Sequence, residues 1–561
     1  MIMQFKWKTL FLLMFGLAWT ACTHTKPAAP TFTPPASDYS FLNRIDSVTV
    51  RQHLIILSSD AMEGRGTGTA GEQRATAYIS EQMKLAGLEP AAPNGTWFQE
   101  VPLLGATPRV VQNLTFTGGA SSFSGNLTTD FTAATDLDAT SIKTEGDLVF
   151  VGYGIHAPQL GWDDFKGMDL RGKILVSFVN DPPPTDQEPN RFKADTLTYY
   201  GRWTYKHEEA RRQGAKGIVL IHTTPTASYP FAVLGNGATR EQIQFANPPE
   251  NPLELKAWIT QQMGEQLATM SGSTLEQWFA DAASKDFKPR AIPVKLALEM
   301  AYTVRRFSGT NVIGKITGST TPNEAILFSS HHDHLGVGRP NKEGDAIYNG
   351  AVDNASGVAM LLTMAKALKS AAIPPKRTMV FASVTAEESG LLGSAYYALH
   401  PTFPAAQVVA NLNVDSGNVY GKTNDISGIG AETSEMLRWL RNEAAVENMT
   451  VSPDPSPNAG LFFRSDQLSF ARTGIPAFFL NNGRHYLNRP EGYYERMEGE
   501  YLATRYHQPD DEFDATWPMG GLVQQMRVCT RLGYDLAITS SWPQWKPGAE
   551  FEPARKASQS K

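Results

Sequence analysis

Cysteine is almost absent from this sequence: its 561 residues include only Cys22 and Cys529. Two thiols are too few for a disulfide-built scaffold or for a structural zinc site closed mainly by cysteine. Beyond the N-terminus, the sequence also lacks a run of about 20 apolar residues, the length that a bilayer-spanning helix needs. The 50 basic and 56 acidic residues leave a net charge of -6. We therefore expect no nucleic-acid partner, because neutralising phosphates requires a strongly basic face.

Three common catalytic signatures are missing as well. The sequence has no G-x-S-x-G elbow of a serine hydrolase and no G-x-x-x-x-G-K-[ST] loop that cradles phosphates. No cysteine is placed as a nucleophile, and Cys529 lies in a helical pattern that predicts a small buried core residue. Catalytic chemistry must therefore come from other residue types.

The first 21 residues have the form of an export signal. Lys6 and Lys8 precede the short apolar run LFLLMFGL, and small residues precede Cys22. This pattern resembles a bacterial lipoprotein signal, which predicts removal of residues 1–21, a lipid on Cys22 and a tether over residues 22–40. The protein is then expected to be anchored to the cell envelope, in the periplasm or at the outer membrane, with the lipid as its sole membrane contact. The alternative is ordinary secretion with an incidental Cys22.

The rest of the chain alternates between two kinds of pattern. From residue 311, continuous apolar runs such as EAILFSS, RTMVFASVT and QVVANLNVD alternate with helical segments such as NASGVAMLLTMAKALKS. This alternation predicts an α/β fold with a mostly parallel central sheet flanked by helices. We expect residues 41–140 and 301–540 to build one domain, residues 141–300 to form a smaller β-rich insertion, and residues 541–561 to be a tail.

Polar side chains gather where the predicted strands end. The first strand ends in the run His331-His332-Asp333-His334, and the pair Glu387–Glu388 follows the second strand. Asp415 follows the third strand, and Asp353 opens a helix between the first two. Carboxyl ends of parallel strands share one edge of a sheet, which is where ligands bind in open α/β folds. Such a histidine and carboxylate set suits zinc, manganese or cobalt, and it is too large for one tetrahedral ion. It predicts a two-metal site, with His507 as the additional imidazole.

Five motifs, in this order, carry a family resemblance: SSHHDHLG, GAVDNASGVAML, TAEESGLLGS, LNVDS and YHQPDDEF. They resemble the co-catalytic zinc aminopeptidases, a family that includes secreted bacterial leucyl aminopeptidases and is related to glutamate carboxypeptidase, the transferrin receptor and glutaminyl cyclase. Two further stretches, LSSDAMEGRGTGTAGEQ and RSDQLSFARTGIPAFFL, match as well. The resemblance covers about residues 45–535 and implies a zinc exopeptidase fold, of the phosphorylase/hydrolase-like kind.

The resemblance also implies a role for each motif residue. Two zinc ions are expected per chain, with Glu387 as the general base and Asp333 as the carboxylate that orients an imidazole. Asp353 is expected to bridge the two ions, next to a cis peptide bond between Asp353 and Asn354. The implied metal ligands are His331, Asp353, Glu388, Asp415 and His507. The substrates would be peptides with a free N-terminus, cut at their first peptide bond.

The inserted segment has a resemblance of its own. LRGKILVSFV (170–179) and EEARRQGAKGIVLI (208–221) resemble the strand–helix–strand pattern of a protease-associated domain. Such domains lack catalytic groups and usually sit beside the active site. We expect this insertion to limit access to the active site, so that only short peptides reach it.

Other interpretations remain open at this point. A carboxypeptidase or dipeptidase needs a basic group for a terminal carboxylate, which Arg464, Arg484 or Arg505 would supply. A non-catalytic surface binding protein on a peptidase fold is the alternative from another class. Some polar residues have plain interpretations: His332 and His334 as solvated or hydrogen-bonded neighbours of the ligand, and a solvated acidic run formed by Asp510, Asp511, Glu512 and Asp514. The sequence indicates no oligomeric state.

Overall fold

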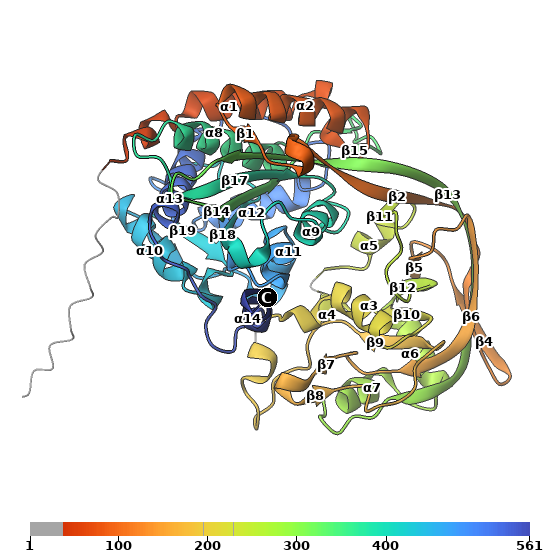
Figure 1. Cartoon of the computed structure of the whole chain (residues 1–561). Helices are drawn as coiled ribbons and strands as arrows, with labels where there is room; N and C mark the ends of the chain where they lie inside the picture. The colour runs from red at the N-terminus through yellow and green to blue at the C-terminus, as the bar shows by residue number, and fades with distance from the viewer. Residues whose placement is uncertain (1–37, 195, 228, 561) are drawn as a thin grey trace, which may run out of the picture.

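The computed structural model of the chain (Figure 1) describes residues 38–194, 196–227 and 229–560. The expected signal segment, Cys22 and most of the expected tether therefore lie outside the described residues. Within the described residues, no helix combines the length and the apolar character that crossing a membrane requires.

The central sheet has a parallel core. Its strands pair in the order β13–β17–β14–β18–β21–β19–β20, and the four from β17 to β21 run parallel. All residues of β17 and β18 are buried, as expected for strands covered on both faces. The strands are β13 (Arg290–Ile316), β14 (Thr321–His331), β17 (Arg377–Val384), β18 (Val408–Val414), β19 (Asp425–Ile429), β20 (Thr450–Ser452) and β21 (Ala477–Asn481).

Helices cover both faces of this sheet, and Figure 1 shows α1 and α2 lying across its top. The larger apolar core joins one face to five helices: α1 (Ser47–Leu57), α2 (Ala70–Leu85), α8 (Gly357–Lys369), α10 (Met436–Val446) and α13 (Gly520–Ile538). A second apolar core joins the opposite face to α9 (Leu392–Leu399) and α11 (Gln467–Arg472). Two further helices are α12 (Tyr493–Thr504) and α14 (Glu552–Gln559). Cys529 is fully buried in α13, as predicted.

A smaller β-rich lobe, residues 112–289, stands beside the sheet, at the lower right of Figure 1. Its central strands pair in the order β6–β9–β10–β12–β5, and the first four run parallel. The lobe contains β3 (Leu114–Gly118), β4 (Ser121–Gly125), β5 (Phe131–Ala134), β6 (Ser141–Phe150), β9 (Ile174–Phe178), β10 (Gly217–Ile221), β11 (Gln242–Phe245) and β12 (Leu255–Ile259). Its helices are α3 (Trp203–Arg212), α4 (Thr224–Ala227), α5 (Ala232–Gly237), α6 (Gln261–Met270) and α7 (Leu275–Ala282).

Two long strands join the lobe to the rest of the molecule. β2 (Phe98–Val111) and β13 pair antiparallel along most of β2, and β13 then continues into the central sheet. The expected boundary at residues 300/301 falls inside β13, a strand of 27 residues. The remaining strands are short: β1 (Glu89–Pro90), β7 (His156–Ala157), β8 (Trp162–Asp163), β15 (Gly336–Val337) and β16 (Ile347–Tyr348). The fold is the predicted α/β arrangement of a largely parallel sheet between helices with a β-rich lobe.

Candidate metal centre

The predicted site residues come together at the carboxyl edge of the parallel strands. His331 is the last residue of β14, Asp415 follows β18 directly, and Glu387 lies three residues beyond β17. Two loops complete the group: residues 351–356 before α8 carry Asp353, and the turn after α12 carries His507. The edge is therefore lined by residues that lie up to 176 positions apart in the sequence.

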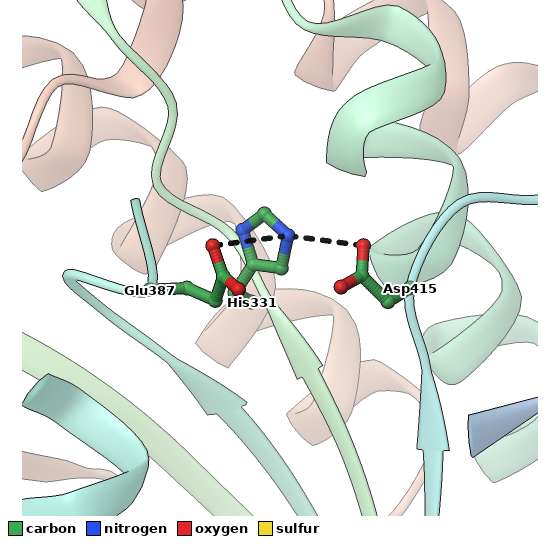
Figure 2. A group of neighbouring side chains, drawn as sticks. All are labelled: His331, Glu387 and Asp415. Atoms are coloured by element: carbon green, nitrogen blue, oxygen red, sulfur yellow. Dashed lines mark hydrogen bonds and ion pairs between the residues drawn. The ribbon is translucent and has the colours of Figure 1, made fainter. Parts of the chain in front are cut away.

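One cluster is centred on the imidazole of His331. Its Nε2 atom lies 3.2 Å from Asp415 Oδ1, 3.3 Å from Asp353 Oδ1 and 4.0 Å from Glu387 Oε2. Figure 2 shows Glu387 and Asp415 on opposite sides of this ring, each joined to it by an interaction. Three carboxylates thus face one buried imidazole nitrogen.

A second cluster is centred on His507. Its Nε2 atom lies 3.0 Å from Glu388 Oε2 and 3.3 Å from Asp353 Oδ2. The two oxygens of Asp353 therefore face different clusters, Oδ1 toward His331 and Oδ2 toward His507. This is the arrangement that a carboxylate bridging two ions requires.

The residues fit divalent cations. Ligand bonds of 2.0–2.1 Å in a tetrahedral zinc shell place neighbouring ligand atoms about 3.3 Å apart, and four of the separations above are 3.0–3.3 Å. His507 Nε2 is shielded from solvent and has no hydrogen-bond partner among the described residues, although it faces two carboxylates. Among the described residues, two groups of histidine and carboxylate donors each lie within reach of one ion: His331 with Glu387 and Asp415, and His334 with Asp353 and Glu388.

The electrostatics of the clusters also favour a bound cation. Burial raises the pKa of Glu387 well above its usual value, and the charges of Asp415 and Glu388 add to this, against the charge of His331. Burial opposes protonation of both imidazoles. The charge of Glu388 nevertheless raises the pKa of His507 to about 10, and the charges of Glu387 and Asp415 hold the pKa of His331 well above its usual value. The site thus has an excess of negative charge that metal ions would neutralise.

The structure assigns Asp333 a different contact from the one expected. His331 Nδ1 faces the main-chain carbonyl of Asp333 at 3.2 Å, whereas the Asp333 carboxylate is 3.7 Å away. That carboxylate instead accepts hydrogen bonds from the backbone amides of Glu387 (3.0 Å) and Glu388 (3.3 Å). Asp333 therefore orients the two glutamates, and its carbonyl orients the imidazole.

His334 contacts the site as a hydrogen-bonding neighbour. Its Nδ1 atom lies 2.6 Å from Glu388 Oε1, while the other oxygen of Glu388 faces His507. A separation of 2.6 Å is shorter than two ligands of one tetrahedral ion adopt. His334 thus fixes the orientation of Glu388. His332 points elsewhere and contacts Ser383 Oγ at 3.0 Å.

The expectation that Asp511 belongs to a solvated acidic run is wrong. Asp511 is fully buried, and its carboxylate accepts hydrogen bonds from the backbone amides of Val352 and Asp353 at 3.1–3.2 Å. It therefore supports the loop that presents Asp353, where the expected cis peptide bond between Asp353 and Asn354 is present. No local pattern distinguishes Asp511 from its exposed neighbour Asp510, because the distinction depends on a loop some 160 residues earlier in the sequence.

Arg65 is a second supporting residue that sequence reasoning missed. Its guanidinium is fully buried and donates hydrogen bonds to four main-chain carbonyls, those of Leu57, His332, Asn349 and Gly350. It thereby joins the segment before α2 to the strand end and the loop that carry the site. Its position in the motif EGRGTG, quoted for the resemblance, was the available signal.

Comparisons with known proteins agree with this geometry. Residues 311–527 match the family described as peptidase family M28. A probable zinc metalloprotease of Pyrenophora tritici-repentis is 35% identical over 241 residues, which are 42% of this chain and 52% of that protein. The aminopeptidase NAALADL1 of Mus musculus is 31% identical over 113 residues, 19% of this chain and 13% of that protein. Matches to the zinc metalloprotease relatives span between 21% and 52% of their length.

Solved structures resemble the chain over a longer span. An aminopeptidase from Aneurinibacillus sp. strain AM-1 is 19% identical, with a TM-score of 0.49, and the match covers 90% of this chain and 97% of that one. The protein has an α/β fold with a set of histidine and carboxylate donors of the kind that holds divalent metal ions. The match to peptidase family M28 thus covers the part of the chain that carries the candidate metal centre.

Proposed function

We propose that the protein is a zinc-dependent aminopeptidase that hydrolyses the first peptide bond of peptides with a free N-terminus. The observation that carries this proposal is the split of the Asp353 carboxylate between two clusters, with Glu387 beside one of them. The mouse relative's name, aminopeptidase, supports the choice of exopeptidase class.

In this proposal the chain holds two zinc ions. His331, Asp353 and Asp415 would hold one, and His507, Asp353 and Glu388 would hold the other. Such ions polarise a scissile carbonyl and lower the pKa of water toward about 7. The α-amino group of the substrate would bind at this centre, which would limit cleavage to the first residue.

Glu387 is proposed as the general base. Its carboxylate lies at the edge of the His331 cluster, and its backbone is fixed by the Asp333 carboxylate. Glu387 accepts a proton from the attacking water and transfers it to the leaving amine, which is general acid–base work worth about 10²–10⁴-fold in rate. Without bound cations, burial and the nearby carboxylates hold the pKa of Glu387 above its usual value.

Glu387→Gln tests this role. The variant keeps the shape of the side chain but not the base, so we expect kcat to fall about 10²–10⁴-fold while the zinc content measured by mass spectrometry stays the same. Glu276→Gln, on the exposed side of α7, is the matched control and should retain wild-type turnover. Near-normal turnover in the Glu387 variant would contradict the assignment.

A panel of aminoacyl anilides, with and without N-acetylation, tests the exopeptidase class. We expect cleavage of the free-amine substrates only, its loss on chelation, and its recovery with zinc. Cleavage that survives acetylation would favour the carboxypeptidase or dipeptidase alternative. A protein that binds no zinc and cleaves nothing would favour a binding protein on a peptidase fold.

We also propose that the protein is exported and anchored by a lipid on Cys22. Support comes from the sequence pattern of residues 1–22 alone. Palmitate labelling that Cys22→Ser abolishes would support the anchor, and labelling of neither form would contradict it.

A further inference from the structure

One strand of the lobe has an unpaired edge on the side of the catalytic sheet. β11 pairs with β2 in an unbroken antiparallel register, from Gln242 opposite Ala106 to Phe245 opposite Leu103. Figure 1 shows β11 next to β2, on the side of the lobe nearer to α9. Within the described residues, no strand pairs with the other edge of β11.

The register identifies the backbone groups on this free edge. The amide of Ala246, the residue after β11, donates a hydrogen bond to the carbonyl of Pro102, its opposite residue in β2, at 3.0 Å. In an antiparallel pair such bonded positions alternate with positions whose N–H and C=O groups point the other way. Gln244 therefore bonds to β2, whereas Ile243 and Phe245 direct their N–H and C=O groups outward. Across the described part of the chain, these outward groups have no hydrogen-bond partner.

The rest of β11 is held firmly in place. The side chain of Gln242 donates a hydrogen bond to the Ala133 carbonyl of β5 at 3.3 Å, and the side chains of Ile243 and Phe245 pack in an apolar cluster with Leu103. All four residues of the strand are partly exposed. The strand QIQF contains no charge, proline or bulge, which are the devices that keep an edge strand from pairing. The edge is thus a preformed template for an extended chain.

The end of β11 lies close to the proposed general base. Phe245 is opposite Leu103 of β2, and Leu103 belongs to the same small apolar cluster as Ala386. Ala386 directly precedes Glu387. The ring of Phe245 is also 6.2 Å from the ring of Tyr396 in α9, the helix that follows the turn carrying Glu387. Opposed strand residues lie about 4.5–5.5 Å apart and packed side chains touch at about 4 Å, so Phe245 is within roughly 20 Å of Glu387.

The start of β11 is connected to the same centre by a second path. Glu241, directly before the strand, forms a salt bridge with Arg305 at 2.6 Å, and Arg305 donates a hydrogen bond to the Thr67 carbonyl at 3.4 Å. The Thr67 hydroxyl donates to the Asp333 carboxylate at 3.3 Å, and that carboxylate orients Glu387. Both ends of β11 are therefore fixed relative to the metal centre.

We propose that the free edge of β11 binds the part of a peptide substrate that lies beyond its first peptide bond, as an added strand that pairs with Ile243 and Phe245. This inference rests on the proposed function and specifies its substrate class as extended peptides of about six residues or more, because each residue advances about 3.3–3.6 Å. Main-chain pairing of this kind is largely independent of the peptide's side chains. The lobe then binds substrate as well as limiting access.

Two amides of different length test the edge, Leu-Ala-amide and Leu-Ala-Ala-Ala-Ala-Ala-amide. We expect wild-type kcat/KM to be at least about tenfold higher for the longer peptide, since several main-chain hydrogen bonds add to its binding. N-methylation of one residue at a time, from the third to the sixth, should lower the rate at alternate residues only, because alternate residues of a strand point toward its neighbour. Equal rates for the two lengths, or an N-methyl effect without this alternation, would overturn the inference.

A proline in β11 tests the same contact from the side of the protein. Ile243→Pro removes an outward N–H and none of the bonds to β2, a change that an edge strand tolerates. Ile243→Ala is the matched control, because it also shortens the side chain but keeps the N–H. We expect the ratio of kcat/KM between the long and the short amide to be at least about threefold lower in the proline variant than in the alanine variant. The same ratio in both variants would contradict the inference.

Hydrogen exchange of Glu387→Gln protein, with and without the longer amide, measures binding without turnover and without any change in β11. We expect slower exchange at the amides of Ile243 and Phe245 on adding peptide, and unchanged exchange at residues 218–220 of β10. If the wild type cleaves no peptide, the proposed function fails, whereas this measurement still decides the inference. Unchanged exchange at both β11 amides would overturn it. A dimer, seen by light scattering, that Ile243→Pro dissociates would show instead that the edge pairs with a second copy of the chain.

Discussion

Asp510 and Asp511 are neighbours in one acidic run, yet only Asp511 is removed from solvent. Its carboxylate accepts the backbone amides of Val352 and Asp353, while the burial that these contacts impose raises its pKa to about 6. Hydrogen bonds from the backbone amides favour the charged form of this carboxylate and so offset part of the cost of burying it. Asp511 therefore acts on the metal centre through Asp353, as a positioning residue.

We expect Asp511→Asn to lower the affinity of the centre for metal, although Asp511 is not one of the proposed ligands. The Asn amide carries no charge, so its oxygen accepts the backbone N–H groups more weakly and its NH2 group brings a donor toward them, and the loop that presents Asp353 loses a constraint. Loss of such an outer contact typically lowers metal affinity or activity about 10–100-fold. Competition with a chromogenic chelator measures the affinity, and Asp510→Asn is the matched control. Equal zinc affinity in the two variants would contradict this role.

For single residues, the sequence predicts the chemical group that a residue contributes better than it predicts the partners that the residue contacts. The strand-end histidine and carboxylates were predictable because their element places them at one edge of the sheet. The contacts of Asp333, His334 and Arg65 were not, because each depends on where the partner loop lies in space. Periodicity and spacing contain no information on such long-range contacts.

Among the elements, α1 and α2 were predictable from helical spacing of their apolar residues, and they pack over the central sheet. α2 stops at Leu85, and Gly87 just beyond it has φ +81°, a conformation that glycine adopts readily after a helix. The domain boundary within β13 was harder to predict, because a strand shared by lobe and sheet has no turn residues to mark a boundary.

The contact between α1 and α2 predicts an acid-sensitive stability. His53 of α1 is buried, its Nδ1 lies 2.7 Å from Tyr78 Oη of α2, and burial, with the charge of Lys366, lowers its pKa to about 4. In the unfolded chain the pKa of this histidine is near 6.5. Below that pH the unfolded chain therefore binds a proton that the folded chain does not bind. Stability from this residue is therefore complete above pH 6.5 and declines as the pH falls toward 4.

Urea unfolding of chelated protein at pH 7.5 and pH 4.5 measures this decline. We expect His53→Gln to reduce the loss of unfolding free energy by about 2–3 kcal/mol, since one pKa unit corresponds to about 1.4 kcal/mol. His400→Gln, at an exposed position, should leave the loss as in the wild type. An identical pH dependence in wild type and the His53 variant would show that the imidazole titrates freely.

On the scale of the whole molecule, the chain concentrates its excess negative charge at one place. Residues from three strand ends and two loops bring four carboxylates, those of Asp353, Glu387, Glu388 and Asp415, into one buried edge. Their ligand chemistry appears in the sequence, because each follows a recognisable strand or opens a helix.

Metal removal should therefore loosen the catalytic part of the molecule more than the lobe. Ions that bind only the folded chain stabilise it by about 4 kcal/mol at a thousand times their Kd. Here the proposed ions would cross-link the loops around residues 353 and 507 to the strand end at His331. The lobe strands β6, β9 and β10 contain none of the proposed ligands and pack in apolar cores formed mostly by lobe residues. Hydrogen exchange with and without a chelator should show faster exchange at residues 351–356 and 505–512, unchanged exchange at residues 148–150 and 174–178, and recovery on adding zinc. Glu388→Gln protein should already exchange faster and respond little to the chelator. If chelation instead accelerates exchange uniformly over lobe and sheet, or nowhere, these residues do not hold the ions that stabilise the fold.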